Sequence, residues 1–377
     1  MQNCSDYLIH LVRCAIHNIT PSEIPDGVIF DSVYKLAVRH DIVNLAYCSI
    51  KMLENKPESD LMKKWDALHN EGIIRDLNQK FARDELTEAL ETAGIHNTEV
   101  QGTVIKPLYP LPEYRTMSDI DIIVEPEKLS RVYSILEELG YKCSYFRDYD
   151  INAERKPNIN VEIHTSFFAV DSDFCGVLGD PFADKTEGSY HVTMNRDTVY
   201  LYNILHTAKH YFFAGCGIRR ILDIYFLNRE YADVATKPGT RALFTALGIA
   251  DFVRDASELA ECWFGEKERN PRTELCEMAD IIIGAGVHGT GRRKLMNQLE
   301  KNAKKGTNVN FYVLRRVFPE KWKMYQRYPV LKRYPVLWPF CWSHRLFYAL
   351  IKKRSAIRIE IDTIRDAFSH RKNKKDQ

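Results

Sequence analysis

The residues with the clearest chemical potential in this 377-residue chain are two aspartates at the start of an apolar run. The run SDIDIIV, residues 118–124, predicts a buried strand, because it is mostly β-branched and apolar. Side chains at i and i+2 of a strand share one face, so we expect Asp119 and Asp121 side by side. Two such carboxylates repel each other unless a cation neutralises them. Hard oxygen ligands suit Mg²⁺ or Mn²⁺, so the pair predicts a divalent metal site; two solvated acids at a strand end are the alternative.

A second predicted strand, within residues 158–168, carries a third acid. Apolar Val161 and Ile163 alternate with Glu162 and His164, so the two polar side chains share one face. A neighbouring strand could bring Glu162 to the aspartate pair. Three carboxylates on two adjacent strands can hold two divalent ions, the arrangement used for in-line nucleotidyl transfer. Glu162 would then complete the second metal site and help activate an acceptor hydroxyl.

Further motifs surround these acids in a fixed order. They are Gly102, Tyr109-Pro110-Leu111-Pro112, Arg115, Asp119-Ile120-Asp121, Leu139-Gly140-Tyr141 and Glu162-Ile163-His164. This ordered set resembles the polymerase-beta-like nucleotidyltransferase superfamily, and more closely its bacterial branch of largely uncharacterised nucleotidyltransferase family proteins. The resemblance extends from about residue 30 to about residue 345.

The resemblance implies an α+β fold with a small mixed sheet, flanked by N-terminal and C-terminal helical regions. It implies metal-dependent transfer of a nucleoside monophosphate from an NTP to an acceptor hydroxyl, with release of pyrophosphate. Mg²⁺ or Mn²⁺ would be held by Asp119, Asp121 and Glu162. The acceptor could be a sugar, a metabolite, a protein or an RNA end.

One departure from the branch leaves a second function open. Gln101 stands where the branch usually has lysine, so a phosphate contact could be missing. The alternative is therefore a catalytically weak or inactive relative that binds nucleotide or docks on a membrane or partner. A metal-dependent phosphoesterase, with water as the acceptor, could use the same acids.

Several residues near the predicted metal strand are candidates for nucleotide binding. Gly102 would let the backbone approach a phosphate, although an ordinary strand-to-helix glycine is an equal alternative. Arg115 could bind a phosphate with two hydrogen bonds, or pair with one of the two aspartates. Lys106 and Ser118 complete this group, with a solvated side chain as the alternative for Lys106.

A later helical pattern, residues 197–213, places His206 and His210 one turn apart. It is not the zinc-protease motif H-E-x-x-H, because Thr207 occupies the position of the glutamate. In the resembled family this helix faces the active site, and Lys209 and His210 match its Lys-His pair. The resemblance therefore implies that both contact the nucleotide.

Four residues are expected to contact and position the side chains that bind the metal and the nucleotide. They are His164, His206, Arg220 and Asp223. We expect Asp223 to orient His206 or His210, although Arg220 and Asp223 lie three residues apart and could simply pair.

The pattern predicts four regions along the chain. Residues 1–93 form an N-terminal helical region and residues 94–195 the nucleotidyltransferase core. Residues 196–310 form a helical domain that completes the active-site cleft, and residues 311–377 a basic, aromatic-rich helical tail. His40, in the first region, is expected to be a satisfied structural histidine.

The net charge of +2 hides an asymmetry between the tail and the rest of the chain. The tail has 17 Lys and Arg against 5 Asp and Glu, an excess of +12, which leaves −10 for residues 1–310. Aromatics within a basic rim suit an anionic membrane surface or RNA, while packing on the acidic body is the third alternative. We expect packing for the repeated Tyr-Pro segments and surface contact from Lys352 onward.

Cysteine usage and hydropathy indicate the cellular compartment of the protein. Nine scattered cysteines without C-x-x-C pairs argue for a reducing cytoplasm and against disulfide partners and a zinc site. The first residues lack a signal-peptide pattern, and no apolar run is long enough to span a bilayer. The sequence predicts a cytoplasmic protein, peripheral to the inner face of the membrane if the tail binds lipid.

Overall fold

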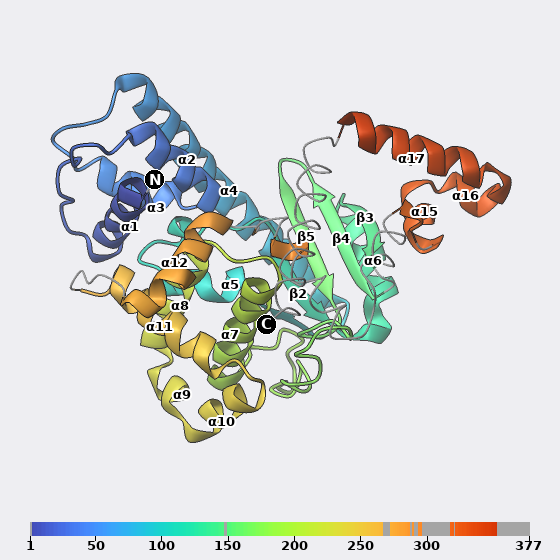
Figure 1. Cartoon of the computed structure of the whole chain (residues 1–377). Coiled ribbons are helices and arrows are strands. Elements are labelled where there is room, and N and C mark those ends of the chain that lie inside the picture. Colours follow the sequence, from blue (N-terminus) through green and yellow to red (C-terminus); the bar gives the residue numbers. More distant parts are fainter. Residues whose placement is uncertain are drawn as a thin grey trace, which may run out of the picture. The chain divides into compact units, whose positions relative to one another are not determined.

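The computed structural model describes residues 2–146, 149–266, 272–286, 289, 293–295, 317–319 and 321–352. The chain divides into two compact units (Figure 1). The first comprises Met1–Lys209 and Cys216–Val287, and the second His210–Gly215 and His288–Gln377. The tail contacts expected beyond Lys352 lie outside the described residues, and the division into four regions stays a prediction.

A five-stranded mixed sheet forms the centre of the first unit. Its strands are β1 (Asn97–Glu99), β2 (Ile120–Val124), β3 (Lys142–Phe146), β4 (Asp150–Arg155) and β5 (Ile159–His164), in the order β1-β2-β5-β4-β3. β2 and β5 run parallel, and the other neighbours are antiparallel. The predicted α+β fold with a small mixed sheet and flanking helices is confirmed.

One face of this sheet is apolar and packs against two helices, α4 (Ser59–Thr92) and α6 (Leu129–Glu138). The strand residues of this core are Ile120, Ile122, Val124, Ile151, Ala153, Ile159, Val161 and Ile163. Because side chains alternate along a strand, the residues between them point to the opposite face. That face carries Asp121, Glu162 and His164, so packing and chemistry occupy opposite sides of the sheet.

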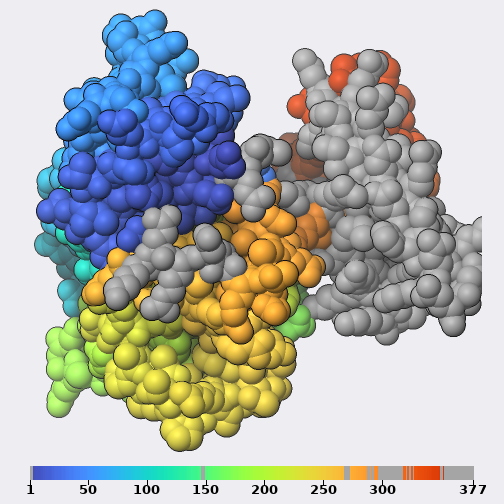
Figure 2. Space-filling view, turned by 60° about the vertical axis from the view of Figure 1, so that its left-hand side comes forward, coloured from blue at the N-terminus to red at the C-terminus, as the bar shows by residue number. Residues whose placement is uncertain are grey.

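The N-terminal helix α1 (Gln2–His17) packs against α2 (Phe30–His40) and α3 (Val43–Ile50) and also against a helix from far along the chain, α11 (Ala250–Phe264). Figure 2 shows the blue N-terminal segments lying directly against the yellow and orange ones. Arg13 Nε donates to Gly265 O at 3.0 Å, and the ring of His17 bonds Phe264 O at 2.7 Å. The first and last parts of this unit therefore share one packed interior.

His40 joins three helices as a structural histidine. It ends α2 and is fully buried. Its Nδ1 accepts from Ile218 N at 3.1 Å, at the start of α8 (Ile218–Glu230), so Nε2 carries the proton and donates to Ile283 O at 3.1 Å in α12 (Thr273–Ala285). Burial lowers the pKa of His40 to about 4, which keeps the ring neutral. The predicted structural role is confirmed.

The remaining helices of the first unit are α5 (Gly102–Ile105), α7 (Arg196–Phe213, whose last residues belong to the second unit), α9 (Ala232–Thr236) and α10 (Pro238–Ala246). The segment 238–264 forms two helices, α10 and α11. Gly248, with φ +67°, ends the first of them because its left-handed backbone cannot continue a helix.

The described helices of the tail belong to the second unit. They are α15 (Lys321–Arg327), α16 (Val330–Arg333) and α17 (Trp338–Lys352). Across the described part of the chain, no helix combines the length and apolar character needed to cross a membrane.

Candidate metal centre

The parallel pairing of β2 and β5 builds the centre of the candidate site. In this register Asp121 lies opposite Glu162, and Ile123 lies opposite His164. Asp121 is buried, whereas Glu162 and His164 are partly exposed. The two strands thus present three polar side chains on the face that α4 and α6 leave uncovered.

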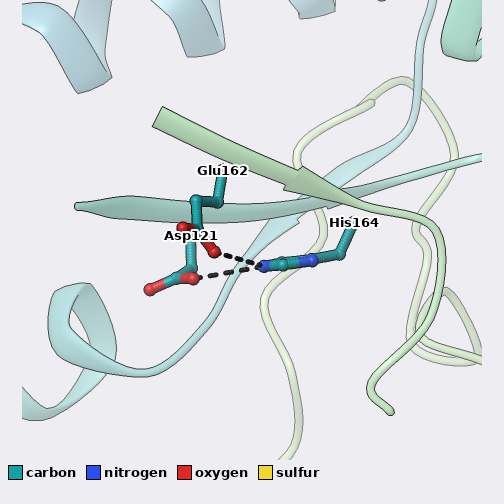
Figure 3. Close-up of side chains that lie close together, drawn as sticks. All are labelled: Asp121, Glu162 and His164. Carbon is teal, nitrogen blue, oxygen red and sulfur yellow. Dashed lines mark hydrogen bonds and ion pairs between the residues drawn. The ribbon is translucent and has the colours of Figure 1, made fainter. Parts of the chain in front are cut away.

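The His164 ring points one nitrogen toward the carboxylates of both Asp121 and Glu162 (Figure 3). Its Nε2 is 3.2 Å from Asp121 Oδ1 and 3.8 Å from Glu162 Oε2. Its Nδ1 is 3.4 Å from Asp150 Oδ1 on β4. One ligand atom from each of Asp121, Glu162 and His164 lies within 4.8 Å of the other two.

The electrostatics of the cluster show how closely its charges are packed. Burial, and then the charges of Asp121 and Asp119, raise the pKa of Glu162 to about 7. Burial opposes protonation of His164, but its hydrogen bonds with Asp121 and Asp150 raise its pKa to about 10. His164 is therefore protonated at neutral pH in this arrangement, and its charge offsets part of the carboxylate repulsion; a bound cation would displace the proton from Nε2, because only a deprotonated imidazole nitrogen can be a metal ligand.

Asp119 occupies a different place from the one expected. β2 begins at Ile120, so Asp119 precedes the strand and is not held by its pleat. It is not part of the group of three ligands within 4.8 Å. It is nevertheless near enough to feel the same charges: burial, and then Asp121, raise its pKa to about 6, while Arg219 and Arg220 act in the opposite direction.

The donor set of this cluster fits a divalent cation. Two carboxylates and one imidazole approach from adjacent strands, and the pKa of Glu162 is raised by burial and then by neighbouring negative charge that a cation would relieve. Carboxylate oxygens suit Mg²⁺ and Mn²⁺, and imidazole nitrogen also binds transition metals.

Asp150 was not predicted as a neighbour of His164, although it alternates with Ile151 and Ala153 as a strand residue should.

Arg115 and Asp223 form a buried ion pair behind this cluster. Arg115 Nε and Nη2 lie 2.8 and 2.9 Å from the two carboxylate oxygens of Asp223, and the Tyr109 hydroxyl donates to Oδ1 at 2.7 Å. Burial opposes ionisation of Asp223, but the charge of Arg115 outweighs it and lowers the pKa. These contacts correct two expectations: Asp223 holds Arg115 rather than orienting a histidine, and Arg115 pairs with Asp223 rather than with a metal-site aspartate.

The other candidates before β2 have mixed surroundings. Lys106 is ion-paired with Asp76 of α4, and both side chains are mostly buried. Ser118 is exposed, and its carbonyl accepts from Asn160 Nδ2 at 3.3 Å. Ser118 thus lies beside β5, whereas the side chain of Lys106 contacts α4.

The turn at Gln101 and Gly102 is tightly packed. Gln101 has φ +57° and ψ −119°, an uncommon conformation for a residue with a side chain, and its side chain hydrogen-bonds the buried Tyr202 hydroxyl. A Cβ on Gly102 would lie 2.5 Å from Met117 Sδ and 2.8 Å from Arg115 Nη1. Glycine is needed here because the space is filled by side chains that approach the site.

Helices α7 and α8 contribute the remaining candidates. Arg220 Nη1 lies 3.3 Å from His206 Nδ1, and burial lowers the pKa of this guanidinium. Lys209 is exposed, with its Nζ 5.8 Å from the ring centre of Phe168, just beyond β5. His210 belongs to the second unit.

Comparison with known proteins identifies the part of the chain that carries this arrangement. A family model described as "Uncharacterised nucleotidyltransferase" matches residues 26–265. This span contains all five strands, α7 and α8. Searches of curated proteins and of solved structures give no match.

Proposed function

Because the chain belongs to the family of uncharacterised nucleotidyltransferases, we propose that it transfers a nucleoside monophosphate from an NTP to an acceptor hydroxyl, using Mg²⁺ or Mn²⁺. The observation that carries the proposal is the cluster of Asp121, Glu162 and His164 on two paired parallel strands. This cluster lies within the matched region and is close to Asp119.

Different residues of the chain would have different roles in such a reaction. Asp121 and Glu162 would hold the divalent ion, and Asp119, directly before β2, is near enough to Asp121 to feel its charge. When bound, the ion supplies charge neutralisation at the α-phosphate and on leaving pyrophosphate. Glu162 is the more exposed carboxylate of the pair, so it is placed to meet an acceptor hydroxyl and help activate it.

Cations for the triphosphate come from α7 and α8. Lys209 is exposed beside the end of β5, and Arg220 is near enough to Asp119 to act on its pKa. Arg115 and Lys106 are engaged with Asp223 and Asp76, so their main contribution is to hold the elements that carry the site. Gly102 and Ser118 flank the same face through the backbone and an exposed hydroxyl.

A nucleotide-binding protein without turnover is the second candidate. Gln101 supplies an amide at a strained turn, and that amide bonds Tyr202. An amide adds no positive charge for a phosphate. Nucleotide binding that depends on Asp121, without pyrophosphate release under any condition, would favour this candidate.

The test is a screen of the four NTPs with Mg²⁺ or Mn²⁺, with cell extract as the source of acceptor and pyrophosphate as the readout. We expect Asp121→Asn to abolish release and to weaken metal–NTP binding in calorimetry. The matched control is Asp251→Asn, at an aspartate on α11 whose side chain is 85% exposed. Unchanged metal–NTP affinity in the Asp121 variant would refute the metal role.

A further inference from the structure

The described tail has a composition unlike the rest of the chain. Residues 321–352 contain seven Lys and Arg, no Asp or Glu, and nine aromatic residues. This segment forms α15, α16 and α17 of the second unit. A segment with one sign of charge and many aromatics favours an anionic partner that also offers apolar contact.

Four large apolar side chains form an exposed stripe along this segment. Val336, Phe340, Phe347 and Ile351 are 79%, 75%, 66% and 48% exposed. Their spacings of four, seven and four residues place them on one side of α17 and the turn before it. We call these four residues the apolar stripe.

Several other aromatic residues of the described tail pack against partners within it. The ring of Trp342 stacks on Phe318 with centres 5.1 Å apart, and its Nε1 donates to Val317 O at 2.9 Å. Trp338 meets Tyr325 edge-on at 5.8 Å. The two tryptophans of α17 pack inward, while its two phenylalanines face outward.

We propose that the apolar stripe docks this protein on the surface of an anionic lipid bilayer. The stripe would enter the boundary between headgroups and acyl chains, with α17 lying in the plane of the membrane. The basic residues around it, including exposed Lys332 and Arg333, would meet lipid phosphates and carboxylates. The 15 described residues of α17 are fewer than the about 20 that a helix needs to span the hydrocarbon core.

The charge and shape of the segment disfavour two other partners. A second copy of the segment would bring seven positive charges against seven more, with no acid to pair with them. Single-stranded RNA is bound by stacking bases on successive aromatic rings, whereas the ends of the apolar stripe are the aliphatic residues Val336 and Ile351. An apolar ridge with basic flanks matches a lipid surface better than either.

The experiment is co-sedimentation of the full chain with vesicles of phosphatidylcholine alone or with about one third phosphatidylglycerol, which supplies the anionic surface. Binding should require the anionic lipid and should weaken as salt is raised. Phe340→Ser and Phe347→Ser should each lower the vesicle partition constant about tenfold, because each removes a buried aromatic ring from the lipid. The double variant should not pellet.

A matched control is available on α4. Phe81 is 71% exposed in the first unit, so Phe81→Ser removes a comparable ring outside the apolar stripe. It should pellet like the unaltered chain, and equal melting temperatures would show that all variants are folded. No pelleting of the unaltered chain, equal loss in the Phe81 variant, or unchanged binding of the double variant would overturn the proposal. RNA binding that needs Phe340 and Phe347, without vesicle binding, would overturn it in favour of RNA.

Discussion

Asp223→Ala is the substitution that best tests how the candidate site is held in place. Asp223 has no exposed surface, and the Arg115 side chain is only 3% exposed. Three donors share the Asp223 carboxylate: two guanidinium nitrogens at 2.8 and 2.9 Å and the Tyr109 hydroxyl at 2.7 Å. The pair connects α8 to the segment that leads into β2, so its loss should also disturb Asp119.

The expected magnitude follows from what the substitution leaves behind. Removing one partner of a buried ion pair leaves an uncompensated charge and costs about 3 to 5 kcal/mol. The hydroxyl of Tyr109 also loses its acceptor, a loss of about 1 kcal/mol or more. We therefore expect Asp223→Ala to destabilise the first unit by about 4 to 6 kcal/mol. Replacing both charges, as in Arg115→Met with Asp223→Leu, should recover most of this loss, because no buried charge remains.

Urea unfolding followed by circular dichroism measures these differences. The control is Asp197→Ala, which breaks a pair with Lys237 of 2.6 Å whose side chains are 49% and 45% exposed. Exposed pairs contribute about 0 to 1 kcal/mol, so the control should unfold nearly as the unaltered chain does. The reasoning is wrong if Asp223→Ala costs no more than the control, or if the double replacement is worse than the single one.

Three further predictions concern packing, pH and catalysis. Gly102→Ala should cost about 1 to 3 kcal/mol in urea unfolding, because its Cβ would meet Met117 and Arg115; an unchanged midpoint would contradict this packing. The lowered pKa of His40, about 4 against an ordinary 6.5, contributes stability above pH 6.5 that is lost as pH falls toward 4, about 3 kcal/mol in all. Unfolding measured at pH 7 and pH 4.5 should show this loss, and His40→Asn should reduce it. Glu162→Gln should lower turnover by about 10² or more while changing nucleotide affinity little; equal losses in both would place Glu162 on the nucleotide side.

The part of the site that follows from strand periodicity could be predicted from the sequence. The alternation around Val161 and Ile163 indicates which side of β5 is buried, so the shared face of Glu162 and His164 follows directly. The pairing of β5 with β2 is a tertiary event: the sequence allowed a neighbouring strand to bring Glu162 to the aspartates, but the parallel direction did not follow from it.

The parts of the candidate site that the sequence did not predict depend on tertiary contacts, which the spacing of residues along the chain does not reveal. Arg115 and Asp223 are 108 residues apart, and only the folded chain brings α8 against the loop before β2. Their spacing in the sequence suggested Asp119 or Asp121 as the partner of Arg115, and Arg220 as the partner of Asp223. Four of the six residues of β4 are polar, so its first residue, Asp150, gave little sign that it would reach His164. The starting residue of β2 decided the place of Asp119, and strand ends are poorly marked by propensity.

The packing of α1 has a consequence for the order in which the protein folds during synthesis. Leu8, Leu11 and Val12 are fully buried, and α1 packs on both α3 and α11. The bond between His17 and Phe264 spans 247 residues, which a ribosome takes roughly 12 to 50 s to make. During that interval α1 can pack only on α2 and α3, and the apolar surface that later contacts α11 stays exposed. The earliest helix of the unit is thus among the last to be fully covered, and a nascent chain arrested before α11 should expose it to chaperones.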